Sequence, residues 1–309
     1  MLIKPDCISC ILKMAITAIR NLTSDEAVIQ DLTVRILTIP SLRGLRWDLS
    51  SPEVIEQVME KIIMAFQTPD PFQALKREQN RVGQALYPTL KKLVREADDP
   101  LQAAVKMAIM GNAIDLMISD HPLDLEKTLV QGLEQPWPEK PFVAFKKKLE
   151  QTRSLVYLGD NCGEIVFDKL LLEIILETYH PQVVFVVRSV PALNDATRSE
   201  AEMVGLDQVA VIMPNGLTAP VPGTILSRCS PELREAIREA DLVISKGGGN
   251  FDALEGEKDL RADISFMLLS KCIPYCHYFH TQMYQPILAN YFSTKKFSDA
   301  TEDQNIRPA

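Results

Sequence analysis

The sequence predicts an α/β protein in which a helical N-terminal domain precedes a doubly wound parallel sheet. In residues 1 to about 135, apolar residues recur at helical spacing and glycine is nearly absent, whereas after residue 142 short apolar runs alternate with helical stretches. Such alternation indicates parallel strands joined by helical crossovers. The chain has 309 residues, 46% of them hydrophobic, which is enough for two domains with sizeable cores.

Five helices are expected in the N-terminal domain, residues 1–135. The apolar positions of residues 8–22 follow the three-and-four spacing of one helix face. A polar start signal at residues 23–26 opens a second helix. Prolines open the other three helices, because proline suits the first turn of a helix. These prolines are Pro52, Pro71 and Pro100.

Residues 134–141 contain three prolines and are expected to join the two domains, since proline interrupts a continuing helix. We assign residues 142–296 to the α/β domain and expect a flexible polar tail at residues 297–309. Helices are predicted at Ile165–Thr178 and Pro231–Ala240. The predicted strands are Ser154–Leu158, Val183–Val187, Val209–Met213, Leu242–Ser245 and Ile264–Leu269.

The composition excludes several classes of protein. A net charge of −8 argues against a nucleic-acid-binding protein, because affinity for the phosphate backbone rests on clustered Lys and Arg. The first 22 residues lack the order of a signal peptide, and no apolar run reaches the roughly 18 residues of a membrane span. We therefore expect a cytoplasmic protein that binds neither nucleic acid nor membranes, with its six cysteines reduced.

Polar residues follow the first two predicted strands, where sheets of this kind place their ligands. Asp160 and Asn161 come directly after the first strand, and Asp195 follows the second. Neighbouring strands would bring these oxygen donors together, and hard oxygen donors suit a divalent cation. The alternative is that each of them caps the helix that follows it.

Positively charged groups stand at the same predicted edge and suit a phosphate group. Arg188 follows the second strand and offers a guanidinium. The loop at residues 245–250 has three consecutive glycines beside Lys246, so exposed backbone amides and an ammonium could bind an oxyanion. Lys271, after the fifth strand, is a second possible cation. The alternatives are a tight turn before a helix and a solvated lysine.

The helical half offers two further motifs. Asn112 and Asp115 lie three residues apart in an apolar helix and so share one face, where an internal polar contact is the alternative to a functional role. Cys7 and Cys10 form a Cys-x-x-Cys pair at a predicted helix start. No second pair stands near it in the sequence, and a structural zinc site needs four ligands.

Together these motifs resemble those of a known family. The most specific pair is Asp-Asn-x-Gly-Glu at residues 160–164 with Lys-Gly-x-Gly-Asn at residues 246–250, and the resemblance runs in order from about residue 4 to residue 276. The chain is similar to the damage-control phosphatase family, long catalogued as domain of unknown function eighty-nine. Its Cys-x-x-Cys resembles that of the microbial branch.

The resemblance implies a helical N-terminal region packed on a Rossmann-like, three-layer α/β/α domain. It also implies divalent-metal-dependent hydrolysis of phosphate esters, often sugar phosphates or damaged phosphometabolites. The family's metal ligands map to Asp160, Asn161 and Asp195, and its two functional lysines map to Lys246 and Lys271. The chain departs from the family at residue 248, where relatives usually carry Gln, and in the run at residues 273–280.

We therefore expect a metal-dependent phosphomonoester hydrolase that acts on a small phosphorylated metabolite and uses Mn²⁺, Mg²⁺, Co²⁺ or Ni²⁺. The expected metal ligands are Asp160, Asn161 and Asp195. The expected catalytic residues are Asp160, Lys246 and Lys271, and the expected substrate-binding residues are Arg188, Asn112, Asp115, Gly248 and Asn250.

Two rival functions stay open at this stage. A nucleotide-dependent transferase such as a methyltransferase would use the same kind of sheet, but it needs a cofactor-binding glycine loop after the first strand, where residues 159–163 carry ligands instead. A non-catalytic metal- or phosphate-binding protein would show no turnover of a phosphate ester with added Mn²⁺.

Overall fold

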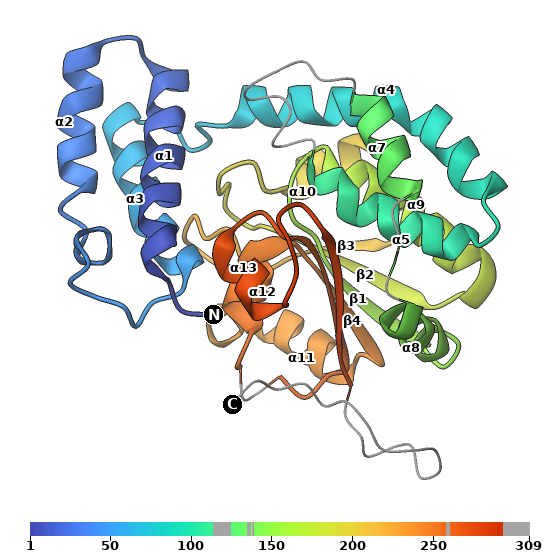
Figure 1. The fold of residues 1–309 in the computed structure, drawn as a ribbon. Coiled ribbons are helices and arrows are strands. Elements are labelled where there is room, and N and C mark those ends of the chain that lie inside the picture. Colours follow the sequence, from blue (N-terminus) through green and yellow to red (C-terminus); the bar gives the residue numbers. More distant parts are fainter. Residues whose placement is uncertain (114–124, 135–136, 138, 258–259, 293–309) are drawn as a thin grey trace.

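The computed structural model describes the chain except for residues 114–124, 135–136, 138, 258–259 and 293–309. The described residues form a sheet with helices on both faces and a further group of N-terminal helices beside it (Figure 1). The predicted α/β class, with its three-layer α/β/α arrangement, is confirmed. The predicted flexible tail, 297–309, lies outside the described residues.

The sheet has six strands in the order β3-β2-β1-β4-β5-β6. All neighbouring pairs are parallel except β5 and β6. The chain moves outward from β1 in one direction and then returns to start again at β4 on the other side, so β1 and β4 flank the switch point at which such sheets bind ligands. The strands are β1 (Ser154–Leu158), β2 (Gln182–Val187), β3 (Val211–Pro214), β4 (Leu242–Lys246), β5 (Ile264–Leu269) and β6 (Pro286–Tyr291).

Side chains of β1 alternate between two hydrophobic cores, as the period of two in a strand requires. Leu155 and Tyr157 belong to the core on one face of the sheet, and Val156 and Leu158 belong to the core on the other. Both faces of the strand are therefore buried, which explains why the sequence shows a continuous apolar run here instead of an alternating one.

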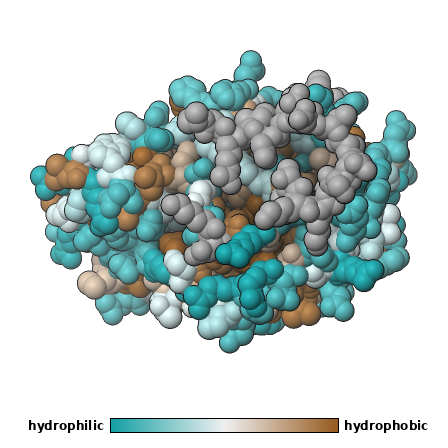
Figure 2. Space-filling view, turned by 90° about the horizontal axis from the view of Figure 1, so that it is seen from below, coloured by the Kyte–Doolittle hydropathy of each residue, from teal (hydrophilic) through white to brown (hydrophobic). Residues whose placement is uncertain are grey.

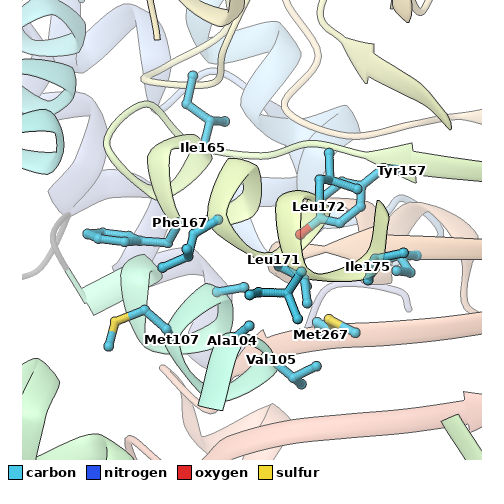
Figure 3. Packing of buried hydrophobic residues seen from close by; sticks show 14 of the residues in the cluster. Ala104, Val105, Met107, Tyr157, Ile165, Phe167, Leu171, Leu172, Ile175 and Met267 are labelled. Atoms are coloured by element: carbon cyan, nitrogen blue, oxygen red, sulfur yellow. The ribbon is translucent and has the colours of Figure 1, made fainter. Parts of the chain in front are cut away.

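The first of these cores lies under helices α4 (Gln73–Glu96), α5 (Pro100–Met110), α7 (Leu125–Glu134) and α9 (Glu164–Tyr179), and the short turn η2 (Gly111–Ala113) continues α5. Helix α9 packs against both α4 and α5. Figure 3 shows side chains of α9 meeting those of α5, β1 and β5, among them Phe167, Leu171, Ala104, Val105, Tyr157 and Met267.

The second core lies under α11 (Pro231–Glu239), α12 (Gly247–Leu254) and α13 (Ile273–Tyr278). At its centre Phe251 packs edge-on against Phe266, with ring centroids 5.1 Å apart. Of the remaining elements, η4 (Leu226–Arg228) contributes to this second core, whereas α8 (Glu139–Leu149), α10 (Arg198–Met203) and η3 (Leu206–Gln208) contribute to the first.

The N-terminal helix group, residues 5–66, comprises α1 (Pro5–Leu22), α2 (Glu26–Ile36), η1 (Pro40–Arg43) and α3 (Ser51–Phe66). Helix α2 begins where the start signal predicts, because the Asp25 carboxylate accepts hydrogen bonds from two backbone N–H groups of the first turn. The group has a core of its own, which includes Ile11, Ala15, Ile19, Leu32, Val58 and Ile62.

The packing divides the chain earlier than the predicted boundary at residue 135. Helices α4, α5 and α7 share the core of the sheet, whereas the residues before Gln73 pack mostly among themselves. The reason is that α9 alone does not bury the apolar residues on its face of the sheet. The apolar side chains of α4 and α5 pack there as well and complete this core.

The predicted joint at residues 134–141 lies partly outside the described residues, and α8 already begins within it at Glu139. Pro141 stands in the first turn of α8, where the missing N–H of proline interrupts no hydrogen bond.

The predicted strands β1 to β5 are all observed, with bounds that differ by at most two residues. Strand β6 was not predicted. It is an antiparallel edge strand in which only Ile287 and Leu288 are buried, so its sequence lacks the apolar run of the others.

Across the described residues, no helix is both long and apolar enough to cross a membrane. Seen from below, the surface is mostly hydrophilic, and its hydrophobic residues lie in small groups (Figure 2).

Candidate active site

The loop after β1 brings Asp160 and Asn161 to the carboxyl edge of the sheet, at the switch point. The strand continues its pairing as far as Gly159, whose N–H donates to the carbonyl of Val186 at 3.0 Å. Helix α9 then begins at Glu164. The side chains of Asp160 and Asn161 are held in the short connection between them, where each residue is less than 9% exposed.

The loop after β2 folds back on the loop after β1. The N–H of Arg188 donates to the carbonyl of Ala196, and the N–H of Ala196 donates to the carbonyl of Asp160, both at 2.9 Å. Asn161 and Asp195 form an isolated antiparallel bridge. The structure thus brings Asp160, Asn161 and Asp195 together, as the adjacency of their strands predicts.

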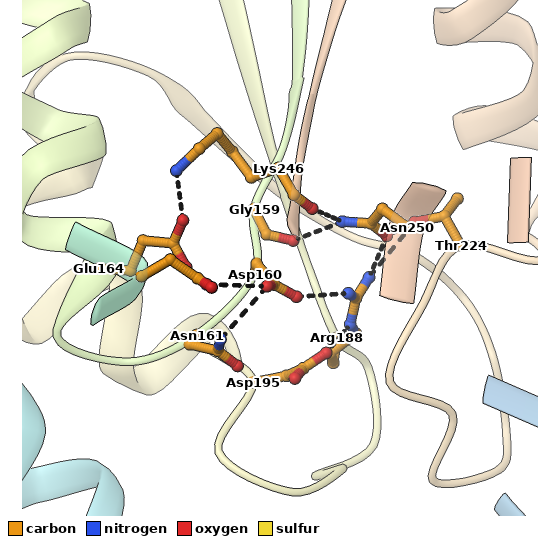
Figure 4. A network of polar contacts seen from close by, with 10 residues as sticks. Gly159, Asp160, Asn161, Glu164, Arg188, Asp195, Thr224, Lys246 and Asn250 are labelled. Carbon is orange, nitrogen blue, oxygen red and sulfur yellow. Dashed lines mark hydrogen bonds and ion pairs between the residues drawn. The ribbon is translucent and has the colours of Figure 1, made fainter. Parts of the chain in front are cut away.

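A buried guanidinium ties the two carboxylates to the rest of the site (Figure 4). Arg188 Nε donates to Asp195 Oδ2 at 2.6 Å, and Arg188 Nη2 lies 3.7 Å from Asp160 Oδ1. Arg188 Nη1 donates to Asn250 Oδ1 at 3.1 Å and to Thr224 Oγ1 at 3.2 Å. Nη2 is buried and has no hydrogen-bond partner within the part of the chain that is described, so the contact it makes there is the ion pair with Asp160.

Negative charge is concentrated at this point. Burial raises the pKa of Asp160 well above its ordinary value, and the charges of Asp195 and Glu164 raise it further, while Arg188 and Lys271 act in the opposite direction. A divalent cation would relieve this repulsion, and two carboxylates with one amide are the oxygen donors that such a cation prefers. The donor set therefore fits a hard divalent metal.

The metal-ligand set is small. Within the described ranges, no three His, Cys, Asp or Glu side chains are grouped so that they could hold a metal ion. The expected set contains only two such residues, Asp160 and Asp195, because its third member is the amide of Asn161. Water would have to supply the other positions of a six-coordinate ion.

The glycine loop after β4 makes room for the carboxylate of Asp160. Gly247 has a φ of +75°, which a residue with a side chain rarely adopts. A Cβ atom there would lie 1.8 Å from Asp160 Oδ2. Glycine is therefore required at this position by both the backbone and the close approach of the carboxylate.

Lys246 does not have the setting that the sequence predicts, in which its ammonium meets the phosphate. The side chain is fully buried, and its Nζ donates to Glu164 Oε1 at 2.5 Å, Asp168 Oδ1 at 2.6 Å and the carbonyl of Ala108 at 2.9 Å. These partners use the three donors of the ammonium. Burial alone lowers the pKa of Lys246, but the charges of Asp168 and Glu164 outweigh it and raise the pKa above its ordinary value.

Asn250 also has partners within the protein at both ends of its amide. Its Nδ2 donates to the carbonyls of Gly159 at 3.0 Å and Lys246 at 2.8 Å, and its Oδ1 accepts from Thr224 Oγ1 at 2.8 Å. In this structure Asn250 joins the end of β1 to the start of α12, and its predicted role in substrate binding stays a prediction.

Gly248 lies half-buried in the first turn of α12, where backbone N–H groups have no acceptor within the helix. A Cβ atom at this position would lie 2.4 Å from the Tyr275 hydroxyl oxygen, which comes from α13. The chain departs from the family pattern at residue 248 and in the run 273–280, and these two departures are in contact. The Tyr275 side chain fills the space that a side chain at residue 248 would need.

The remaining predicted residues have different outcomes. Asn112 lies in η2 at the end of α5 and faces the site, since its Nδ2 donates to Glu164 and lies 3.5 Å from Asp160 Oδ2. Asp115 lies outside the described residues. Lys271 follows β5, and its charge lowers the pKa of Asp160. Its predicted catalytic role stays a prediction.

Four buried polar residues of the site were not predicted. Glu164 and Asp168 stand one helical turn apart in the first half of α9, where their neighbours are mostly apolar and buried. Like charges at this spacing repel each other, so a cation between them could have been expected from the sequence. Gln79 and Asn80 of α4 contact the ligand loops, but polar residues in an amphipathic helix normally face solvent, so the sequence carried no signal for them.

Comparison with known proteins identifies the family. The sequence model described as the damage-control phosphatase ARMT1-like domain matches residues 3–285. The chain belongs to this family. This chain is 30% identical over 281 residues to a damage-control phosphatase of Archaeoglobus fulgidus, and the match covers 89% of this chain and 94% of that protein. It is 28% identical over 278 residues to an uncharacterised protein of Methanocaldococcus jannaschii, with coverage of 88% and 90%.

The fold is shared with a solved structure. A crystal structure of a family protein from Pyrococcus horikoshii matches with a TM-score of 0.83 at 23% identity, covering 94% of this chain and 99% of that chain. The predicted membership of the family is thus confirmed, and the names of the relatives support a phosphatase role in the family. The assignment to the microbial Cys-x-x-Cys branch stays a prediction.

Proposed function

We propose that this family member is a metal-dependent phosphatase of small phosphate esters, such as sugar phosphates or damaged phosphometabolites. The observation that carries the proposal is the meeting of Asp160, Asn161 and Asp195 at the switch point of the sheet, beside one buried guanidinium. The relative from Archaeoglobus fulgidus that is named a damage-control phosphatase supports the phosphatase part of this proposal.

Asp160, Asn161 and Asp195 would hold a divalent cation, Mn²⁺, Mg²⁺, Co²⁺ or Ni²⁺, through their side-chain oxygens. When bound, the ion supplies a Lewis acid that polarises a phosphoryl oxygen. The protein contributes the rigidity of the site. Arg188 Nε and the backbone bonds between the two loops fix the carboxylates before any ligand arrives, so little reorganisation is needed during the reaction.

The phosphate group would lie against the first turn of α12. Gly248 and Gly249 are half-buried there, and their N–H groups are donors that suit an anion at a helix N-terminus. The guanidinium of Arg188 and the charge of Lys271, both of which lower the pKa of Asp160, would add positive potential. Lys246 acts indirectly, because it neutralises Glu164 and Asp168 behind the site.

The proposal is tested by steady-state phosphate release from a panel of sugar phosphates and other phosphometabolites, with each of the four metals and with a chelator. We expect turnover with metal and none with the chelator. Asp195→Asn keeps the shape of the side chain but removes a charge, and it should reduce turnover about 100-fold or more, since the ion provides several kcal/mol of transition-state stabilisation.

Circular dichroism of Asp195→Asn serves as the control for folding. A chelated parent enzyme that hydrolyses the panel as fast as the metal-loaded enzyme would show that the reaction does not depend on a metal. A parent that hydrolyses no phosphate ester with any metal would leave only a binding function.

A further inference from the structure

Helix α4 carries a buried polar face that the proposed function does not use. Lys76, Gln79 and Asn80 are each at most 1% exposed, although they belong to a helix whose other polar residues face solvent. Their spacing places them on one side of α4. Burying polar groups costs free energy unless they are paired. The residues that pair with this face therefore indicate what it does.

The partner of Asn80 is the first ligand loop. Its Oδ1 accepts a hydrogen bond from the N–H of Gly163 at 2.7 Å, in a fully buried contact. Gly163 stands two residues after Asn161 and immediately before α9. The two backbones are also in close contact, since a Cβ atom on Gly83 would lie 2.9 Å from the carbonyl oxygen of Gly163. Helix α4 therefore fixes the end of the loop that carries Asp160.

The partner of Gln79 is the second ligand loop. Its Oε1 accepts from Asn194 Nδ2 at 3.1 Å, and Asn194 is the residue before Asp195. The carbonyl of Asn194 in turn accepts from the N–H of Cys162 at 2.9 Å. Two adjacent residues of one helix thus each hold one of the two loops, at points next to the proposed metal ligands.

Lys76 extends the same arrangement to α10. Its Nζ lies 3.2 Å from Glu200 Oε1 and 2.6 Å from Asp70 Oδ2. Glu200 accepts from the backbone N–H of Thr197 at 2.9 Å and so caps the helix that follows the second loop. The far end of that loop is therefore anchored to α4 as well.

We propose that Gln79 and Asn80 are positioning residues that set the spacing of the two ligand loops and thereby the affinity of the site for a divalent cation. This inference rests on the proposed function. Neither side chain bonds directly to Asp160, Asn161 or Asp195 in the contacts described above. Residues that orient metal ligands from behind typically change metal affinity about 10–100-fold when they are removed.

The experiment measures binding of Mn²⁺ directly, by the electron paramagnetic resonance signal of the free ion, without turnover. The variants are Gln79→Ala, Asn80→Ala and Asn80→Asp, of which the last keeps the oxygen that accepts from Gly163. We expect binding about 10–100-fold weaker for the two alanine variants. Asn80→Asp should recover most of the affinity.

Tyr87→Phe is the matched control. It removes the hydrogen bond from the Tyr87 hydroxyl to Glu173, 2.6 Å long, in the same contact between α4 and α9 but away from the ligand loops. It should lower the melting temperature as the alanine variants do and leave Mn²⁺ affinity unchanged. Gln79→Ala removes the longer of the two hydrogen bonds to the loops, 3.1 Å against 2.7 Å. If Asn80→Ala does not fold, the Mn²⁺ affinity of Gln79→Ala tests the inference.

Alanine variants that melt earlier but bind Mn²⁺ as tightly as the parent would show that Gln79 and Asn80 are structural only, which overturns this inference and leaves the proposed function intact. A folded parent that binds no Mn²⁺ would instead overturn the proposed metal site, and this inference with it.

Discussion

The N-terminal helix group and the active-site edge of the sheet bury side chains of opposite kinds. The N-terminal group has an almost wholly apolar core, and its ion pairs lie on the surface. For example, Arg35 and Asp31 form a 2.8 Å pair in which each side chain is more than 60% exposed. At the active-site edge, the pair of Lys246 and Glu164 is at most 1% exposed.

The difference shows where polar groups have been retained for function. Exposed ion pairs contribute little to stability, so their positions carry little information. Buried ion pairs must overcome a large desolvation cost and are often no more stabilising than apolar residues of the same shape. A cluster of buried charges beside a sheet switch point is therefore evidence of a site, and the apolar core of α1 to α3 is evidence of packing alone.

The largest effect is expected where a buried charge loses its partner. Lys246→Met leaves the carboxylates of Glu164 and Asp168 buried without their cation, and it should reduce the free energy of unfolding by about 3–5 kcal/mol in urea denaturation. Adding Glu164→Gln and Asp168→Asn to Lys246→Met should recover much of this loss. If Lys246→Met alone were as stable as the parent, the two buried carboxylates would not need the charge of Lys246.

The next largest effect is the pH-dependent contribution of the Glu200 carboxylate to the free energy of unfolding. Burial tends to raise the pKa of Glu200, but hydrogen bonds from Thr197 and the charge of Lys76 outweigh it and lower the pKa below its ordinary value of 4.5. Because the folded pKa is the lower one, the stabilisation is fully present above about pH 4.5 and is lost as pH falls through the folded pKa.

Glu200→Gln should therefore lower the free energy of unfolding by about 1.5–3 kcal/mol at pH 7, the usual contribution of hydrogen bonds to a charged group. Denaturation measured from pH 7 down to acid should show the gap between parent and variant closing below about pH 4.5. A gap that stays constant across this range would show that the charge of Glu200 does not matter.

A smaller effect is expected in the apolar core of the N-terminal group. Ile62→Val removes one methylene from a fully buried side chain and should cost about 0.5–1.5 kcal/mol of unfolding free energy. Among the described residues, this core contains no member of the site, and of the second ligand loop only the partly buried Leu193 packs against it. KM and the metal concentration for half-maximal activity should therefore change little. A shift in either quantity would show that the group and the site are coupled.

The smallest effect is expected for the exposed pair. Arg35→Ala should change the free energy of unfolding by less than about 0.5 kcal/mol, and less still in high salt. If denaturation instead shows a loss comparable to that of Ile62→Val, the contrast between exposed and buried pairs is weaker than described here.

The sequence was a sufficient guide wherever function depends on neighbouring strands. Strands β1 and β2 are continuous apolar runs, so Asp160, Asn161 and Asp195 could be placed at one edge before any contact was known. It was not sufficient where a side chain's partner comes from a distant helix. Lys246 beside three glycines suggests a phosphate contact, and only the fold shows that Glu164 and Asp168 take its ammonium.

The same limit applies to α4. Gln79 and Asn80 look like solvent-facing residues of a polar helix, because the sequence does not show that this end of α4 lies on the ligand loops. Residues separated by 83 and 115 positions in the chain meet there. Local pattern carries no information about contacts over such distances.

The central claim is that Asp160, Asn161 and Asp195 hold a divalent cation. The most direct test is anomalous X-ray scattering from crystals grown with Mn²⁺. We predict one strong peak about 2.0–2.6 Å from side-chain oxygens of all three residues, the range for oxygen ligands of such ions. A fully occupied Mn²⁺ bound elsewhere, with Asp195 still paired with Arg188, would contradict the account.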